Sequence, residues 1–177
     1  RKYKGLKNTI ANKNSFSTML LGNHSLKQLN IVNTTEKDSK ISSVANFLNM
    51  CVTSMGKRKL YATLVRPSCN HDDLNREYDI GEHLYDNELV ITSRQELRKV
   101  VDIEKLTRKL VLKTTTPCDI YMIHESLRHI ILLYNAIQSD SLLKQYLSCD
   151  NITLYCRVIM NNIHDTLNLE QSKLINK

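Results

Sequence analysis

The stretch that decides the fold is TSMGKRKLYATLVRP, residues 53–67. Apolar residues recur at helical spacing before it, from Val44 to Cys51, and within it, from Lys59 to Val65. Gly56 falls between these segments, where a glycine lets the backbone bend or lets another helix approach closely. Pro67 ends the second segment, because proline disfavours helical backbone for the residue before it. The stretch therefore predicts a helix, a bend and a second helix.

Composition favours a helical protein with a basic surface. The chain has 177 residues, enough to bury a core, and only four glycines and two prolines, so long helices are easier to build than many short strands. The formal net charge of +7 favours a polyanionic partner over an acidic protein. A solvated basic surface would give the same charge, so both interpretations stay open.

The spacing of the cysteines indicates the cellular compartment. The five cysteines are scattered and form no Cys-x-x-Cys pair, which predicts reduced thiols in an intracellular compartment, whether mitochondrial, nuclear or viral. No apolar run reaches the length of about eighteen residues that a membrane span needs, so no membrane partner is expected.

The chain starts at Arg1 and ends at Lys177 without a helix-ending glycine. We therefore expect a piece of a longer protein.

Local signals predict one small β element followed by helices. Apolar runs on either side of Gly22-Asn23, within residues 19–32, indicate a strand, a turn and a strand. Asp102 is a suitable N-cap for a helix with Ile103 and Leu106 on one face. Thr116, Pro117 and Asp119 are a stronger helix start, with a cap, a proline at the first helical position and an acid in the first turn. The predicted fold class is mainly α.

No catalytic, cofactor or metal site is predicted in this chain. It contains no Gly-x-x-x-x-Gly-Lys-Ser/Thr phosphate loop, and its histidines lack metal-ligand spacing. Glu125 and His129 lie one helical turn apart and are interpreted as a solvated pair on a helix surface.

The candidate phosphate contacts are Lys57, Arg58 and Lys59. The alternative interpretation is that these three residues form the water-facing side of a helix.

The stretch 53–67 resembles the signature of the core, or lever, domain of MutS-type DNA mismatch repair proteins, Thr-x-Met-Gly-x-Arg-x-Leu followed by Leu-x-x-Pro. The matching residues here are Thr53, Met55, Gly56, Arg58, Leu60, Leu64 and Pro67. Thr63 stands where the family usually has tryptophan. Residues 25–31, SLKQLNI, are similar to the family's short strand Thr-Leu-x-x-Leu-Glu-Ile.

Two later blocks follow in the family's order. Residues 102–108, DIEKLTR, resemble Asp-Leu-Glu-Arg-Leu-x-x-Arg through Asp102 and Glu104, with Arg108 one place early. Pro117 and Asp119, followed by Ser126-Leu127, resemble Pro-x-Asp-Leu and the Ser-Leu of the lever helix. The usage of Ile, Asn and Lys is similar to that of divergent branches, such as coral mitochondrial or giant-virus members.

The resemblance implies a function that composition does not. MutS-type proteins are dimeric clamps that recognise mismatched double-stranded DNA and use ATP, so the full-length parent resembles a DNA-dependent ATPase that needs ATP and Mg²⁺. Residues 1–15 are basic and polar, which indicates a connector or the end of a preceding domain. The resemblance implies the first half of the core at 16–137 and a helical continuation toward the clamp at 138–177. The parent would act as a homodimer or heterodimer. The alternatives are a helical scaffold with a solvated basic face and a stand-alone basic DNA-binding domain.

Overall fold

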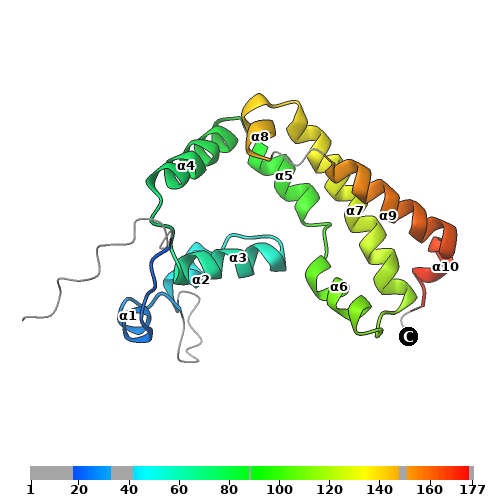
Figure 1. Cartoon of the computed structure of the whole chain (residues 1–177), viewed down its shortest axis with the longest axis horizontal. Coiled ribbons are helices and arrows are strands. Elements are labelled where there is room, and N and C mark those ends of the chain that lie inside the picture. Colours follow the sequence, from blue (N-terminus) through cyan, green and yellow to red (C-terminus); the bar gives the residue numbers. More distant parts are fainter. Residues whose placement is uncertain (1–17, 33–41, 88, 148–150, 176–177) are drawn as a thin grey trace, which may run out of the picture. The chain divides into compact units, whose positions relative to one another are not determined.

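The computed structural model describes residues 18–32, 42–87, 89–147 and 151–175, in which all named elements are helices (Figure 1). The predicted connector, residues 1–15, lies outside the described residues. The chain divides into two compact units, residues 1–50 with 58–79 and residues 51–57 with 80–177. The mainly α fold class is confirmed, and no described helix is long and apolar enough to cross a membrane.

The first unit contains the short helices at the start of the chain. It holds α1 (Asn23–Gln28), α2 (Val44–Leu48), most of α3 (Ser54–Val65) and the first part of α4 (His71–Asp86). After α1, Asn30 turns the chain with a φ of 49°, a left-handed conformation that asparagine tolerates better than most residues. The amides of Val44 and Ala45 then donate to the carbonyls of Asn30 and Ile31, both at 2.9 Å. These bonds join α2 to the end of α1.

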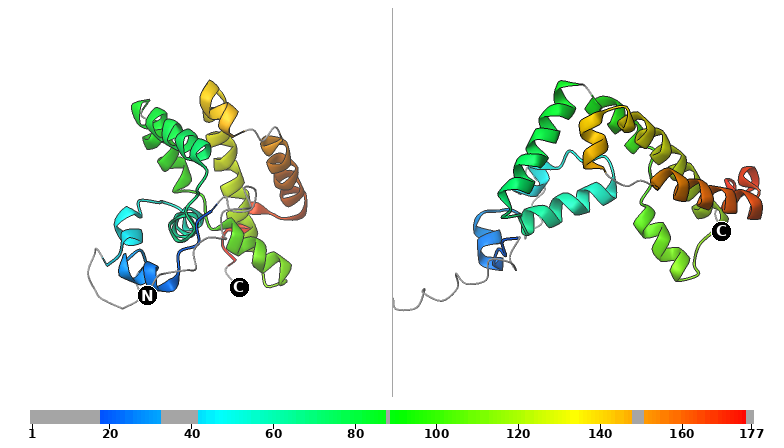
Figure 2. Two further views of the ribbon diagram at one scale, coloured as in Figure 1. Left: turned by 60° about the vertical axis from the view of Figure 1, so that its left-hand side comes forward. Right: turned by 45° about the horizontal axis from the view of Figure 1, so that its top comes forward.

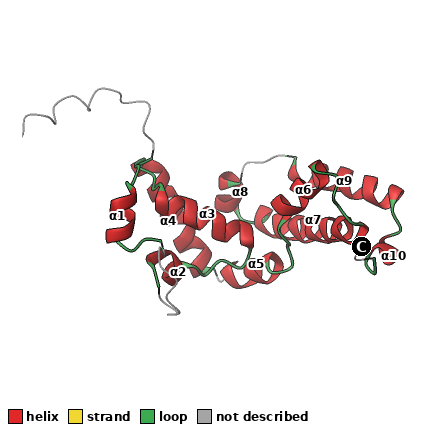
Figure 3. Cartoon of the chain, turned by 90° about the horizontal axis from the view of Figure 1, so that it is seen from below, coloured by secondary structure: helices red, strands yellow, loops and turns green. Residues whose placement is uncertain are grey.

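The predicted strand–turn–strand at residues 19–32 is wrong. Gly22 is the N-cap of α1, and the apolar residues that follow it form one turn of helix with Leu26 buried and Leu29 exposed. The Gly-Asn pair is therefore a helix start and not a hairpin turn. The remaining β pairing in the described residues is one isolated bridge between Thr18 and Ser68. Figure 3 draws the described residues as helices and loops.

The predicted bend between two helices is placed differently in the structure. Helix α2 ends at Leu48 and not at Cys51, and α3 begins at Ser54. Gly56 consequently lies in the first turn of α3, with a negative φ that other residues also adopt. The chain turns at residues 49–53, before the glycine.

The second unit is built around one long helix. It contains α5 (Leu89–Leu97), α6 (Ile103–Val111), α7 (Pro117–Gln138), α8 (Ser141–Tyr146), α9 (Ile152–Thr166) and α10 (Leu169–Ser172). The other five pack against α7, and α9 runs beside it in every view (Figures 1 and 2). The buried apolar cluster joins Leu106 of α6, Ile123 and Leu127 of α7, and Cys156 of α9.

The predicted starts of α6 and α7 are confirmed. Asp102 caps α6 by accepting from the amide of Lys105 at 3.1 Å. Thr116 caps α7 by accepting from the amide of Asp119 at 3.2 Å, and the Asp119 carboxylate accepts from the amide of Thr116 at 3.0 Å. This reciprocal pair is a capping box, and Pro117 fits the first turn because the amide it lacks has no partner there.

Candidate functional site

The first turn of α3 shows why the sequence has a glycine at position 56. The hydroxyl oxygen of Thr53 accepts from the amide of Gly56 at 3.0 Å, which satisfies one of the unpaired amides at the start of the helix. A Cβ atom at position 56 would lie 2.9 Å from that oxygen and 3.5 Å from the Cβ of Cys51. Gly56 is therefore needed for space beside the Thr53 side chain.

The candidate phosphate contacts lie on the same helix. Lys57, Arg58 and Lys59 are all exposed, and they occupy successive positions of α3. Each residue of an α-helix is rotated about 100° from the last, so Lys57 and Lys59 point to nearly opposite sides. The three cations therefore do not form one face, and a phosphate contact remains a prediction for each of them separately.

The other signature residues of this stretch are partly covered. Met55 and Leu60 are half-buried in α3. Pro67 follows the helix, and its carbonyl accepts from the amide of Met19 at 2.8 Å beside the Thr18–Ser68 bridge. These positions have structural neighbours and no chemical group that could react.

An ion pair between a partly exposed lysine and a buried carboxylate holds the end of α6 to the start of α7. The amine of Lys109 lies 2.9 Å from both carboxylate oxygens of Asp119, whose side chain is 5% exposed. The amide of Thr116 and then Lys109 hold the pKa of Asp119 below its ordinary value. Helix α7 begins at Pro117, so Asp119 lies in its first turn. Glu104, the acidic residue in the first turn of α6, is exposed.

The structure corrects which residue completes the Asp102 block. Arg108 is exposed on α6, one place before the position that the family pattern gives to its arginine. That position is Lys109, seven residues after Asp102, and Lys109 is the cation that pairs with Asp119. Lysine instead of arginine at position 109 keeps a positive charge beside the Asp119 carboxylate.

Ser126 links α7 to the chain between α5 and α6. Its side chain is fully buried, and its hydroxyl oxygen accepts from the amide of Val101 at 3.1 Å and donates to the carbonyl of Met122 at 2.8 Å. Both residues of the Ser-Leu block therefore have a structural role. Ser126 accepts a hydrogen bond from a backbone amide 25 residues away, and Leu127 belongs to the buried cluster.

The interpretation of Glu125 and His129 as a solvated pair is wrong. His129 is buried, and its Nδ1 lies 2.7 Å from a carboxylate oxygen of Glu96 on α5. Its Nε2 lies 3.1 Å from the guanidinium of Arg128, which can only donate, so Nε2 accepts and Nδ1 carries the proton toward Glu96. Glu125 pairs instead with Arg128 at 2.9 Å.

Glu96 is the acidic centre of this network. It also accepts from the amine of Lys99 at 2.8 Å, and Lys99 followed by His129 lowers the pKa of the Glu96 carboxyl. No local sequence pattern predicts this pairing, because Glu96 and His129 lie 33 residues apart on different helices. The network holds α5 against α7.

The contacts described above hold helices α5, α6 and α7 together. Among the described residues, no group of three or more His, Cys, Asp or Glu side chains is placed to hold a metal ion. A cavity of about 70 Å³ lies between α5, α7 and α8. Its lining is mostly aliphatic, and Glu96, Thr92 and Ser93 are its polar members.

The fold is helical, and in its second unit five helices pack against the long helix α7. Comparison with known proteins gives the family: residues 24–177 match MutS domain III, so the chain belongs to that family. The resemblance found in the sequence is thereby confirmed. No solved structure gives a significant match to the chain.

Three relatives illustrate the range of similarity. The DNA mismatch repair protein MutS of Caldanaerobacter subterraneus is 32% identical over 140 residues, covering 77% of this chain and 16% of the relative. A DNA mismatch repair protein mutS homolog of Acanthamoeba polyphaga mimivirus is 28% identical over 131 residues, 71% of this chain and 12% of the relative. MutS protein homolog 4 of Candida albicans is 23% identical over 155 residues, 87% of this chain and 18% of the relative. The chain thus spans less than a fifth of the length of these relatives.

Proposed function

We propose that this chain is the helical lever of a MutS-type DNA mismatch repair protein. In this proposal the full-length parent binds mismatched double-stranded DNA and ATP, and acts as a homodimer or heterodimer. The segment joins the DNA-binding region to the ATPase region and transmits the state of one to the other.

The observation that carries the proposal is helix α7 and its surroundings. Its 22 residues form a rod of about 33 Å at 1.5 Å per residue. Five helices pack along it, and α5 and α6 are fixed to it by the Glu96–His129 and Lys109–Asp119 contacts. Transmission between distant sites needs stiff elements that move as units, and this rod has the packing of such an element.

ATP and Mg²⁺ are expected elsewhere in the parent. The described residues present no carboxylate cluster for a metal ion, and the sequence has no glycine-rich phosphate loop. These residues do not fit either group, so we assign no chemical step to this segment. Its proposed contribution to DNA binding is limited to phosphate contacts from Lys57, Arg58 and Lys59.

The test is a change in helix stiffness without a change in either binding site. Leu132 lies inside α7 and is 48% exposed. Leu132→Gly and Leu132→Ala remove the same aliphatic contacts, but glycine weakens the helix by about 1 kcal/mol relative to alanine. In the full-length parent, we would measure mismatched-DNA affinity, ATP affinity, and the change in ATP hydrolysis when mismatched DNA is added.

A lever predicts that Leu132→Gly reduces the response of ATP hydrolysis to mismatched DNA several-fold below that of Leu132→Ala. Each separate affinity should stay within about twofold, because the proposal assigns neither binding site to α7. Equal responses in the two variants would show that the stiffness of α7 does not carry the coupling. That result would favour the alternative of a helical scaffold.

A further inference from the structure

The end of α6 exposes three consecutive aliphatic side chains. Val111 is 77% exposed, Leu112 is 64% exposed and Leu110 is 44% exposed. Val111 is the last residue of the helix and Leu112 is its C-cap. An apolar group of this kind on a domain surface is typical of a contact with another macromolecule.

Backbone hydrogen bonds close the end of α6 beneath these side chains. The amide of Leu112 donates to the carbonyl of Arg108, that of Lys113 to Leu110 and that of Thr114 to Lys109, each at 3.0 Å. Lys113 has a φ of 55°, a left-handed conformation that is unfavourable for a non-glycine residue. The helix end is therefore closed by hydrogen bonds, and a lysine occupies the position where glycine would fold at lower cost.

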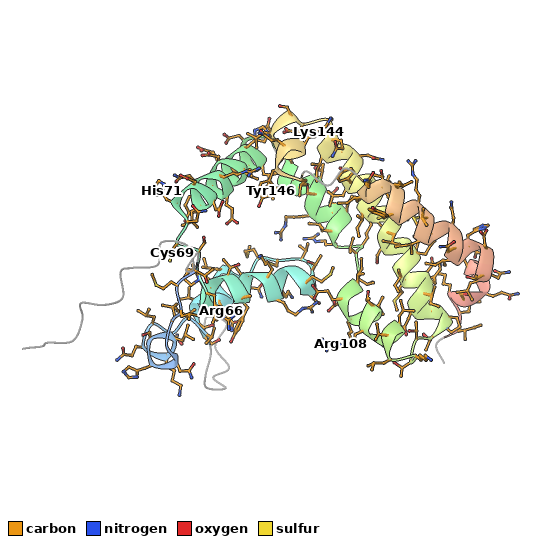
Figure 4. All side chains as sticks on the ribbon, viewed as in Figure 1. Arg66, Cys69, His71, Arg108, Lys144 and Tyr146 are labelled. Atoms are coloured by element: carbon orange, nitrogen blue, oxygen red, sulfur yellow. The ribbon has the colours of Figure 1, made fainter. Side chains whose placement is uncertain are left out.

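The same surface is strongly basic. Residues 105–113 contain Lys105, Arg108, Lys109 and Lys113 and no acidic residue. Lys109 forms an ion pair with Asp119. Lys105, Arg108 and Lys113 are exposed, and none of them forms an ion pair within the described residues. Lys105, Arg108 and Leu112 follow the spacing of one helix face. Figure 4 labels Arg108 on the side of α6 that faces away from α7.

The cations and the aliphatic residues together indicate the kind of partner. Positive charge near a helix C-terminus is favoured by the helix dipole, which accounts for the cations but not for the exposed aliphatic residues. Nucleic acid would neutralise the cations and leave Val111 and Leu112 uncovered. An acidic helix with an aliphatic stripe would match both features.

We propose that the α6 tip, formed by Lys105, Arg108, Val111, Leu112 and Lys113, docks an acidic protein segment that carries aliphatic side chains. The aliphatic side chains of that segment cover Val111 and Leu112. Its carboxylates lie against Arg108, Lys105 and Lys113.

The probe is a fluorescein-labelled synthetic helix with Leu at every third or fourth position and Glu at most others. Its binding to the 177-residue chain is measured by fluorescence anisotropy at two salt concentrations. A second peptide carries Ser in place of Leu. Duplex DNA and vesicles containing phosphatidylserine are tested in the same way.

Two double variants separate the contributions of the tip. Val111→Ser with Leu112→Ser removes the aliphatic part, and Arg108→Gln with Lys113→Gln removes charge. The matched control is Arg157→Gln with Val158→Ser on α9, where both residues are exposed. Circular dichroism melts show whether each variant remains folded.

We expect each tip variant to weaken binding of the Leu-Glu peptide at least tenfold, and the control variant to leave it within twofold. Higher salt should weaken binding by the wild-type chain, and the Ser-Glu peptide should bind at least tenfold more weakly than the Leu-Glu peptide. The proposal is overturned if the Leu-Glu peptide does not bind, or if both peptides bind equally. It is also overturned if the control variant loses binding, or if DNA or vesicles occupy the tip more tightly than the peptide.

Discussion

The amine of Lys109 lies 2.9 Å from each carboxylate oxygen of Asp119, so one buried carboxylate joins the last turn of α6 to the first turn of α7. Asp119 has three roles at once. It pairs with a cation, completes the capping box with Thr116, and places negative charge at a helix N-terminus, where the helix dipole favours it.

Replacing Lys109 by an uncharged residue should destabilise the fold more than replacing it by another cation. Lys109→Met leaves Asp119 buried without its ion-pair partner, and we expect the free energy of unfolding to fall by about 1–3 kcal/mol. Lys109→Arg keeps the charge and should recover most of that loss. Urea unfolding of the three proteins gives the measurement, and equal midpoints for wild type and Lys109→Met would contradict the assigned role.

Stability should fall in acid because of the same carboxylate. The backbone amide of Thr116 and then Lys109 lower the pKa of Asp119 in the folded state, and Lys99 followed by His129 lowers that of Glu96. A carboxyl with a lower pKa in the folded than in the unfolded state stabilises the fold fully above its unfolded value, about 4. That contribution is lost as the pH falls below about 4 and passes through the folded pKa.

The measurement is the urea midpoint between pH 7 and pH 2. Asp119→Asn cannot titrate at this position, so its midpoint should start lower and decline less steeply in acid than that of the wild type. Parallel declines for the two proteins would show that Asp119 does not contribute to the pH dependence.

Two glycines in helices should respond in opposite directions to the same change. Gly56→Ala places a Cβ atom 2.9 Å from the Thr53 hydroxyl oxygen, which should disturb the cap of α3 and cost about 1 kcal/mol. Gly56→Val should cost more, because valine is larger. Gly81 lies inside α4 with no atom within 4 Å of an added Cβ, so Gly81→Ala should stabilise by about 0.5–1 kcal/mol.

Thermal melts of the four proteins test this pair of expectations. Gly81→Ala is the control for the general preference of helices for alanine. If Gly56→Ala melted at a higher temperature than wild type, the tight space beside Thr53 would not matter for folding.

Ser126→Ala should leave the buried amide of Val101 without its acceptor. We expect a loss of about 1–3 kcal/mol in the free energy of unfolding, together with faster hydrogen exchange at the Val101 amide. Ser139 is an exposed serine at the end of α7 whose hydroxyl donates only to the carbonyl of Ala136. Ser139→Ala is therefore the matched control and should change stability by less than about 0.5 kcal/mol.

The Gly22-Asn23 pair shows how one local pattern can have two outcomes. Gly22-Asn23 fits both a hairpin turn and the start of a helix, and the apolar residues around it are too few to separate strand from helix spacing. In the structure one turn of helix buries Leu26 while Leu29 remains exposed. Which apolar side chain becomes buried depends on the rest of the unit, and the sequence of this stretch does not contain that information.

The sequence by itself determined where α6 and α7 begin. Asp102, Thr116 and Pro117 act within three residues of their own positions, through cap hydrogen bonds and a fixed φ, so their effect can be predicted from neighbouring letters. Only the tertiary structure decided that Ser126 binds the amide of Val101, 25 residues away, and that His129 faces Glu96, 33 residues away. Those contacts form because α5 and α7 pack side by side, and packing is set by the whole set of buried surfaces.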